Sequence, residues 1–112
     1  MGPYNEFAII NNINKTSKYS FAYIQEYNYV EISDDYVGKW AESLFEMPVF
    51  WHEINRPSKG LARYGITLIP PESLQIFYRV VKKDENVDEV RELMKMVEEA
   101  IKENKYIIHF GI

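Results

Sequence analysis

The sequence contains no cysteine, only two histidines and five scattered glycines among its 112 residues. Without cysteine the chain can form no disulfide, no thiolate nucleophile and no cysteine-based zinc site, and this composition is typical of a reducing compartment. The two histidines, His52 and His109, are far apart, so a zinc site would have to recruit carboxylates from remote positions. We therefore expect no metal and no cofactor, and we expect a cytoplasmic location.

Characteristic catalytic and nucleotide-binding strings are also missing. None of the patterns of phosphate-binding loops, serine hydrolases or zinc proteases occurs. The start of a calcium loop is imitated at residues 84–88, but Glu89 replaces the required glycine and Lys95 replaces the final glutamate. No run approaches 18 apolar residues, and the first ten residues lack the features of a signal peptide. The sequence predicts no membrane association and identifies no reaction, so an enzyme is not the favoured interpretation.

A strong excess of one charge is absent as well. The net charge is -4, and it arises entirely from residues 84–112, which hold 4 basic and 8 acidic side chains, whereas residues 1–83 hold 9 of each. Nucleic-acid binding is therefore not expected from composition. With 46% apolar residues the chain suits one α+β domain over residues 1–112.

Aromatic residues are the most distinctive feature that is present. Between residues 19 and 29 they follow the two-residue spacing of an extended strand, in the set Tyr19, Phe21, Tyr23, Tyr27 and Tyr29. Because successive strand residues point to opposite faces, these rings share one face of a sheet. We expect a strand over residues 19–32, with a bulge near residues 26–28. Helices can cover one face, so the tyrosine face is either a second core or a surface that meets something else.

Two segments predict helices. Ser33 is a good N-cap with acidic residues behind it, and this helix is expected to end before Pro48. Its buried face is expected to hold Val37, Trp40, Ala41, Leu44 and Phe45. The second helix is expected to begin with an Asn86 cap and to end at Asn104 in a left-handed conformation. Its apolar stripe is expected to hold Val90, Leu93, Met94, Val97, Ala100 and Ile101.

The remaining segments predict strands and one long loop. Residues 48–60 show neither the apolar spacing of a helix nor the alternation of a strand, and they contain two prolines and a glycine, so we expect a loop there. Alternating patterns over residues 61–69 and 73–81, joined through Pro70, Pro71 and Glu72, predict a hairpin. Short strands are also expected at residues 6–13 and 106–110.

The expected order is then β-βαββαβ. Its last six elements resemble the ferredoxin-like arrangement in their order alone, which implies a two-layer α+β sandwich. We therefore expect a mainly antiparallel sheet with two helices on one face and an extra N-terminal strand. In this arrangement residues 19–32 and 73–81 are central neighbours.

This topology predicts a recognition surface on the helix-free face of the sheet. Its candidate partner-binding residues are Tyr23, Tyr27, Tyr29, Phe77, Arg79 and Arg63. Tyrosine and arginine dominate binding hot spots, so we expect a protein-binding module that forms a homodimer or binds another protein. A regulator, an inhibitor or an immunity-type protein would fit this description. The alternative is a half-exposed sheet face, or a core closed by the N-terminal strand, that binds nothing.

A second candidate site lies in the loop. Trp51, His52, Glu53 and Arg56 bring an aromatic ring, an imidazole, a carboxylate and a guanidinium close together in sequence. They predict a small-anion or metabolite site, or a minor enzyme, if His52 moves a proton. Stacking of RNA bases on the sheet is a third reading. It is disfavoured because residues 74–81 lack the basic-glycine-aromatic pattern of such domains.

Overall fold

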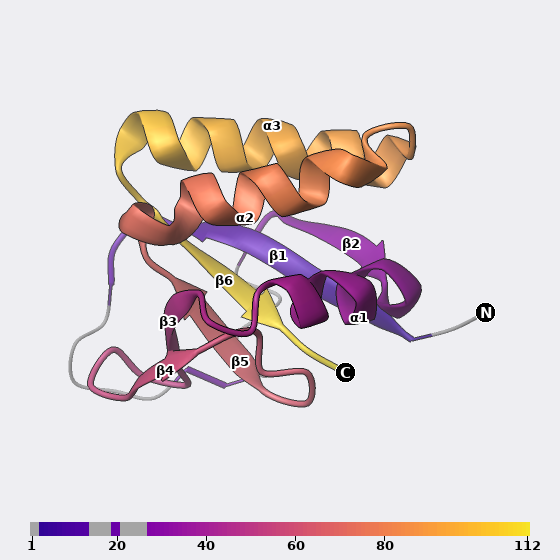
Figure 1. The fold of residues 1–112 in the computed structure, drawn as a ribbon. Coiled ribbons are helices and arrows are strands. Elements are labelled where there is room, and N and C mark those ends of the chain that lie inside the picture. The colour runs from indigo at the N-terminus through magenta and orange to yellow at the C-terminus, as the bar shows by residue number, and fades with distance from the viewer. Residues whose placement is uncertain (1–2, 14–18, 21–26) are drawn as a thin grey trace.

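The computed structural model describes residues 3–13, 19–20 and 27–112. Within them the chain is an α+β protein with a six-stranded antiparallel sheet and three α-helices (Figure 1). The strands are β1 (Tyr4–Ile10), β2 (Tyr29–Ser33), β3 (Pro48–Trp51), β4 (Pro57–Lys59), β5 (Ile66–Ile69) and β6 (Tyr106–Phe110). The helices are α1 (Asp34–Ser43), α2 (Leu74–Val81) and α3 (Asp88–Glu103), with short 3₁₀ turns at Pro71–Ser73 and Lys82–Asp84.

The strands lie in the order β2-β1-β6-β5-β3-β4, and every pair is antiparallel. The C-terminal strand β6 lies between β1 and β5, where it pairs Ala8 with Ile108 on one side and Leu68 with Ile108 on the other. All four residues of β5 are buried, as expected for a strand that is covered on both faces.

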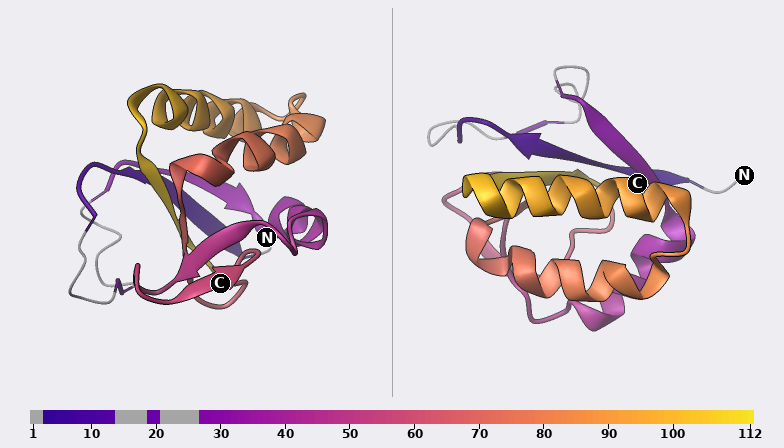
Figure 2. Two further views of the ribbon diagram at one scale, coloured as in Figure 1. Left: turned by 60° about the vertical axis from the view of Figure 1, so that its left-hand side comes forward. Right: turned by 90° about the horizontal axis from the view of Figure 1, so that it is seen from above.

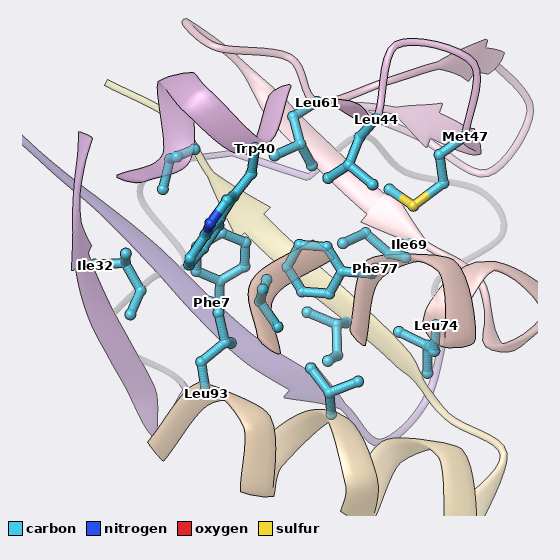
Figure 3. Packing of buried hydrophobic residues seen from close by; sticks show 14 of the residues in the cluster. Phe7, Ile32, Trp40, Leu44, Met47, Leu61, Ile69, Leu74, Phe77 and Leu93 are labelled. Atoms are coloured by element: carbon cyan, nitrogen blue, oxygen red, sulfur yellow. The ribbon is translucent and has the colours of Figure 1, made fainter. Parts of the chain in front are cut away.

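The main core lies between one face of the sheet and the helices. Helices α2 and α3 run side by side over this face (Figures 1 and 2), and α1 packs against β1, β2 and α2. Figure 3 shows the aromatic centre of this core, where the ring of Phe77 lies 5.6 Å from that of Phe7 and 6.4 Å from that of Trp40. Trp40 is tied to the 3₁₀ turn that follows α2 because its indole nitrogen donates to Asp84 at 2.8 Å.

Several elements with strong local signals are confirmed. Helix α1 follows Ser33, whose hydroxyl accepts a hydrogen bond from the Asp35 amide at 3.3 Å. In α3 the stripe residues Val90, Leu93, Val97 and Ala100 are fully buried, Met94 and Ile101 are half-buried, and the strand at residues 106–110 is present. The left-handed Asn104 is also confirmed, with φ 56° and ψ 48°.

Details at the ends of these helices differ from expectation. Phe45 is 67% exposed because α1 already ends at Ser43, so this residue does not belong to the buried face. Helix α3 begins at Asp88 after Val87, and Asn86 lies outside it, so the expected Asn86 cap was wrong.

The strand expected at residues 73–81 was wrong. This segment forms the helix α2, which buries Leu74, Phe77 and Val81 at helical spacing. Apolar residues in this segment fit both the two-residue spacing of a strand and the spacing of a helix, and the Pro70-Pro71 pair suits a hairpin turn. Proline also suits the first turn of a helix, and Pro71 opens the 3₁₀ turn that leads into α2. As a result residues 19–32 and 73–81 are not neighbouring strands, and the expected ferredoxin-like order with two helices is not what the described sheet shows.

The loop expected at residues 48–60 was also wrong, because it contains β3 and β4, which pair as a hairpin. Of the strand expected at residues 61–69, only Ile66–Ile69 is extended and paired. At the N-terminus β1 begins at Tyr4 and ends at Ile10, two residues earlier than expected at its start. The strand expected over residues 19–32 was wrong for most of its described length, because only Tyr29–Ser33 is a strand, β2. Residues 19–20 and 27–28 are not strand, and residues 21–26 lie outside the described part of the chain.

A second, smaller core covers part of the helix-free face. It is formed by buried side chains from β1, β5 and β6 together with Tyr19, namely Ala8, Ile10, Tyr19, Ile66, Leu68, Ile108 and Phe110. Half-buried Ile13, Tyr27, Phe50 and Tyr106 pack against it. The sheet therefore has apolar residues on both faces. The charged residues on its helix-free side lie at its two edges, Glu6 and Glu31 at the β1–β2 end and Lys59 on β4 at the other end.

Candidate protein-binding surface

The most distinctive exposed feature of the helix-free side is a set of four residues on β1 and β2. Tyr4 and Glu6 lie on β1, and Tyr29 and Glu31 lie on β2. Glu6 is directly opposite Glu31, and Tyr29 is directly opposite Ala8, which belongs to the second core. Opposite residues in an antiparallel pair point to the same side, so all four point away from the helices. We call this set the tyrosine–glutamate face.

Both tyrosines of this face are open to solvent. Tyr4 is 43% exposed and Tyr29 is 40% exposed, whereas Tyr19, on the second core, is 8% exposed. Tyr4 lies two residues before Glu6, and Tyr29 lies two residues before Glu31. Because the strands are antiparallel, the two rings flank the pair of carboxylates from opposite ends.

The carboxylate pair is electrostatically unfavourable in the free protein. Opposite residues have Cβ atoms about 5 Å apart, and like charges in that position destabilise a sheet. Burial, followed by the negative charge of Glu31, raises the pKa of Glu6 above its usual value. Neither glutamate forms an ion pair within the described part of the chain.

Two aromatic rings lie beside the tyrosine–glutamate face, on its side toward β6. Glu6 pairs across to Phe110 on β6, and the ring of Phe110 lies 6.2 Å from that of Tyr27. Phe110 is fully buried and Tyr27 is half-buried. The partly exposed Glu6 and the exposed Glu31 thus lie on paired strands beside an apolar layer instead of on a loop.

The structure separates the residues that the sequence grouped as partner-binding. Tyr29 lies in the tyrosine–glutamate face and Tyr27 lies at its border, whereas Tyr23 is outside the described residues. Phe77 was wrongly expected on the helix-free face, because it is fully buried under the helices. Arg79 is exposed on α2, on the opposite side of the sheet.

Arg63 is engaged inside the molecule. Its guanidinium donates to Asp34 in the first turn of α1 at 2.6 Å and lies directly over Gly38, where an added Cβ would come within 3.2 Å of it. The side chain is 33% exposed, and among the described residues its Nε has no hydrogen-bond partner. Arg63 therefore holds α1 against the segment before β5.

The Asp34 carboxylate also belongs to a buried network of hydrogen-bonded side chains. Its Oδ1 accepts from the Asn5 amide nitrogen at 3.0 Å, and Oδ1 of Asn5 lies 2.7 Å from Nε2 of His109. Since that oxygen can only accept, Nε2 carries the proton and Nδ1 accepts from the Thr67 hydroxyl at 3.3 Å. The Thr67 oxygen itself accepts from the Ala62 amide at 2.8 Å.

This hydrogen-bonded network requires a neutral His109. Burial is the main cause that lowers the pKa of His109 to about 3, with a further lowering by Arg63 and an opposing effect of Asp34. The ring is fully buried and stacks 4.8 Å from Phe7. His109 therefore connects β1, β5 and α1 as a structural residue.

The structure gives the loop residues separate sets of contacts. Trp51 packs against the main core and donates its indole N–H to the Gly60 carbonyl at 2.9 Å. The His52 ring lies against the backbone of Gly65, where an added Cβ would be 2.8 Å from Nε2. Glu53 and Arg56 belong to the tight turn of the β3–β4 hairpin, in which the Arg56 amide donates to the Glu53 carbonyl at 3.1 Å.

Sequence reasoning missed three residues of the face, Tyr4, Glu6 and Glu31. The alternation of Tyr4 with Glu6, and of Tyr29 with Glu31, was visible, but it became informative only with the strand register. Because a shift by one residue would move every side chain to the other face, composition alone could not bring the two glutamates together.

No protein-family model, no curated protein and no solved structure matches this chain. Over the described ranges, no group of three or more metal-ligating side chains occurs. Among the helices that the structure describes, none combines the length and the apolar composition that a membrane span requires.

Proposed function

We propose that this protein is a non-enzymatic, cytoplasmic protein-binding module, of the regulator, inhibitor or immunity type, and that the tyrosine–glutamate face is its interface. The observation that carries this proposal is the pair of solvent-exposed tyrosines, at 43% and 40%, around two carboxylates on a regular sheet. Tyrosine contributes large contact area at low entropic cost and is enriched at binding hot spots.

The scaffold supports this role because the face is rigid. β1 is held by β2 on one side and β6 on the other, and Phe110 and Tyr27 pack beside Glu6. Strands that are already paired lose little backbone freedom on binding, which favours affinity.

The charges favour a different protein over a second copy as the partner. In a two-fold symmetric dimer the same patch meets itself. Glu6 and Glu31 of one copy would then approach those of the other copy, and four carboxylates would come together. Like-charge contact across an interface costs several kcal/mol, so homodimerisation through this face is disfavoured.

Site-specific photo-crosslinking in the cells that naturally produce the protein tests the proposal. Benzoylphenylalanine is introduced in place of Tyr29 or Tyr4 in separate variants, and the control variant carries it in place of Phe45, which is 67% exposed beyond the end of α1. We expect the same discrete heteromeric adduct from positions 4 and 29 and none from position 45. The adduct's partner, once purified, should bind the wild-type protein and bind Tyr29→Ser at least tenfold more weakly.

Two results would contradict the proposal. One is the absence of adducts at positions 4 and 29 while the variants are folded, as judged by circular dichroism. The other is equal binding of the purified partner to wild type and Tyr29→Ser.

A further inference from the structure

The negative charge of Glu6 and Glu31 indicates which kind of partner the proposed interface binds. We infer that the occupant of the tyrosine–glutamate face is a basic segment of another protein, with one arginine or lysine side chain seated between Glu6 and Glu31. This inference rests on the proposed function and adds the chemistry of the partner.

The first support is the direct pairing of the two glutamates. Their Cβ atoms are about 5 Å apart and point to the same side, so both carboxylates can reach one cation between them. In the described residues neither of them has a cationic partner. A bound cation would turn a repulsive pair into two attractive contacts, which is charge complementarity in its simplest form.

The second support is the position of the tyrosines. Tyr4 and Tyr29 flank the carboxylates from opposite ends of the pair and are exposed on the same side. A guanidinium group can bind carboxylates through its N–H groups and stack on an aromatic ring at the same time. The face therefore offers both of the contacts that arginine uses in protein interfaces.

The burial of Glu6 gives the third support. Glu6 is only partly exposed and lies beside the buried ring of Phe110, while Glu31 is exposed. A carboxylate in a partly dehydrated position interacts more strongly with an incoming cation than a fully solvated one. Repulsion from Glu31 further raises the pKa of Glu6, and a bound cation would reverse that shift.

Titration with defined peptides tests this inference. The probe is a ten-residue peptide in which arginine and serine alternate, and its control carries neutral citrulline in place of arginine. Binding is followed by the amide NMR signals of the ¹⁵N-labelled protein at low salt. We expect the arginine peptide to shift the signals of residues 4–8 and 29–33 most strongly. The citrulline peptide should bind at least tenfold more weakly, and added salt should weaken binding of the arginine peptide.

Charge-matched variants identify the site. Glu31→Gln and Glu6→Gln should each weaken binding of the arginine peptide roughly threefold to fivefold, as expected for the loss of a single ion pair near the surface. Glu92→Gln changes the net charge equally, but Glu92 is exposed on α3, on the helical side, and this variant should bind as the wild type does. Equal weakening by all three variants, or equal binding of the two peptides, would overturn the inference.

The outcome can be separated from that of the proposed function. If positions 4 and 29 crosslink to a partner whose binding is unaffected by Glu31→Gln and Glu6→Gln, the interface stands and the cationic occupant is wrong. If the arginine peptide binds this face but no crosslinked partner forms there, the charge preference stands and the protein-binding function is wrong.

Discussion

Acidification from pH 7 to pH 5 should destabilise the folded protein through His109. Its pKa is lowered from 6.5 to about 3, mainly because the ring is buried. Nδ1 and Nε2 both lie within hydrogen-bond distance of partners that suit the neutral ring. Between these two pKa values the unfolded chain binds a proton that the folded chain excludes, so the free energy of unfolding falls as the pH falls. At about 1.4 kcal/mol per pH unit below 6.5, the loss at pH 5 is about 2 kcal/mol.

Urea unfolding at pH 7, 6 and 5 measures this loss. With a typical urea dependence for a chain of this size, about 2 kcal/mol lowers the midpoint by roughly 1 M. Glu6 acts in the opposite direction, because its raised pKa makes the folded state bind more protons as the pH falls toward that pKa. The control is therefore His109→Gln, which can still donate to Asn5 and retains Glu6. Its stability at pH 7 should be lower, but its decrease from pH 7 to pH 5 should be smaller than that of the wild type by about 2 kcal/mol.

Parallel pH dependence in the two proteins would refute the reasoning. If His109→Gln does not fold, NMR of the wild-type ring decides the question. The ring signals should show the Nε2–H tautomer and should not titrate above pH 5, and a midpoint near 6.5 in the folded protein would mean that His109 is not excluded from protonation.

Three further predictions concern stability and can be measured by urea unfolding at pH 7. Phe77→Ala should cost roughly 3 to 5 kcal/mol because it empties the centre of the main core, whereas Arg79→Ala, on the exposed side of the same helix, should change stability by less than about 0.5 kcal/mol. Gly111→Ala should cost roughly 1 to 3 kcal/mol, since the new Cβ would lie 2.3 Å from the Arg63 carbonyl oxygen. Glu31→Gln should stabilise by about 0.5 kcal/mol because it removes a like-charge pair across the strands.

For each of these three predictions, one result would contradict the structural reasoning. Similar costs for Phe77→Ala and Arg79→Ala would contradict the helical assignment of residues 74–81. A neutral Gly111→Ala would mean that the backbone contact with Arg63 is not tight. Destabilisation by Glu31→Gln would mean that the carboxylate is satisfied in the free protein.

Elements with redundant local signals could be predicted from the sequence. Helix α1 combines the Ser33 cap with a single apolar face, and α3 has a long helical stripe that ends at Asn104. In α1 the apolar periodicity agrees with the Ser33 cap, and in α3 it agrees with the left-handed Asn104, so neighbouring residues suffice to determine that both segments are helical. The α+β class followed from them, together with the β-branched and aromatic strand at residues 106–110.

Local signals do not determine the structure of residues 73–81, because this segment fits both the alternating pattern of a strand and the spacing of a helix. Helix α2 forms there because Leu74, Phe77 and Val81 can be buried together against α3 and the sheet, and this arrangement leaves Ile76 39% exposed. Local sequence cannot choose between two periods that both place apolar residues on one side. Burial in the assembled core decides between them.

The candidate surface illustrates the same division. The sequence alone determined that aromatic residues are concentrated in strand-like segments, that no catalytic string is present and that α1 and α3 are helices. Only the tertiary structure brought Glu6 opposite Glu31, placed Phe77 in the core and joined His109 to Asn5 across the sheet. Strand register and the covering of each face depend on contacts between distant segments, and a shift by one residue reverses which side chains meet solvent.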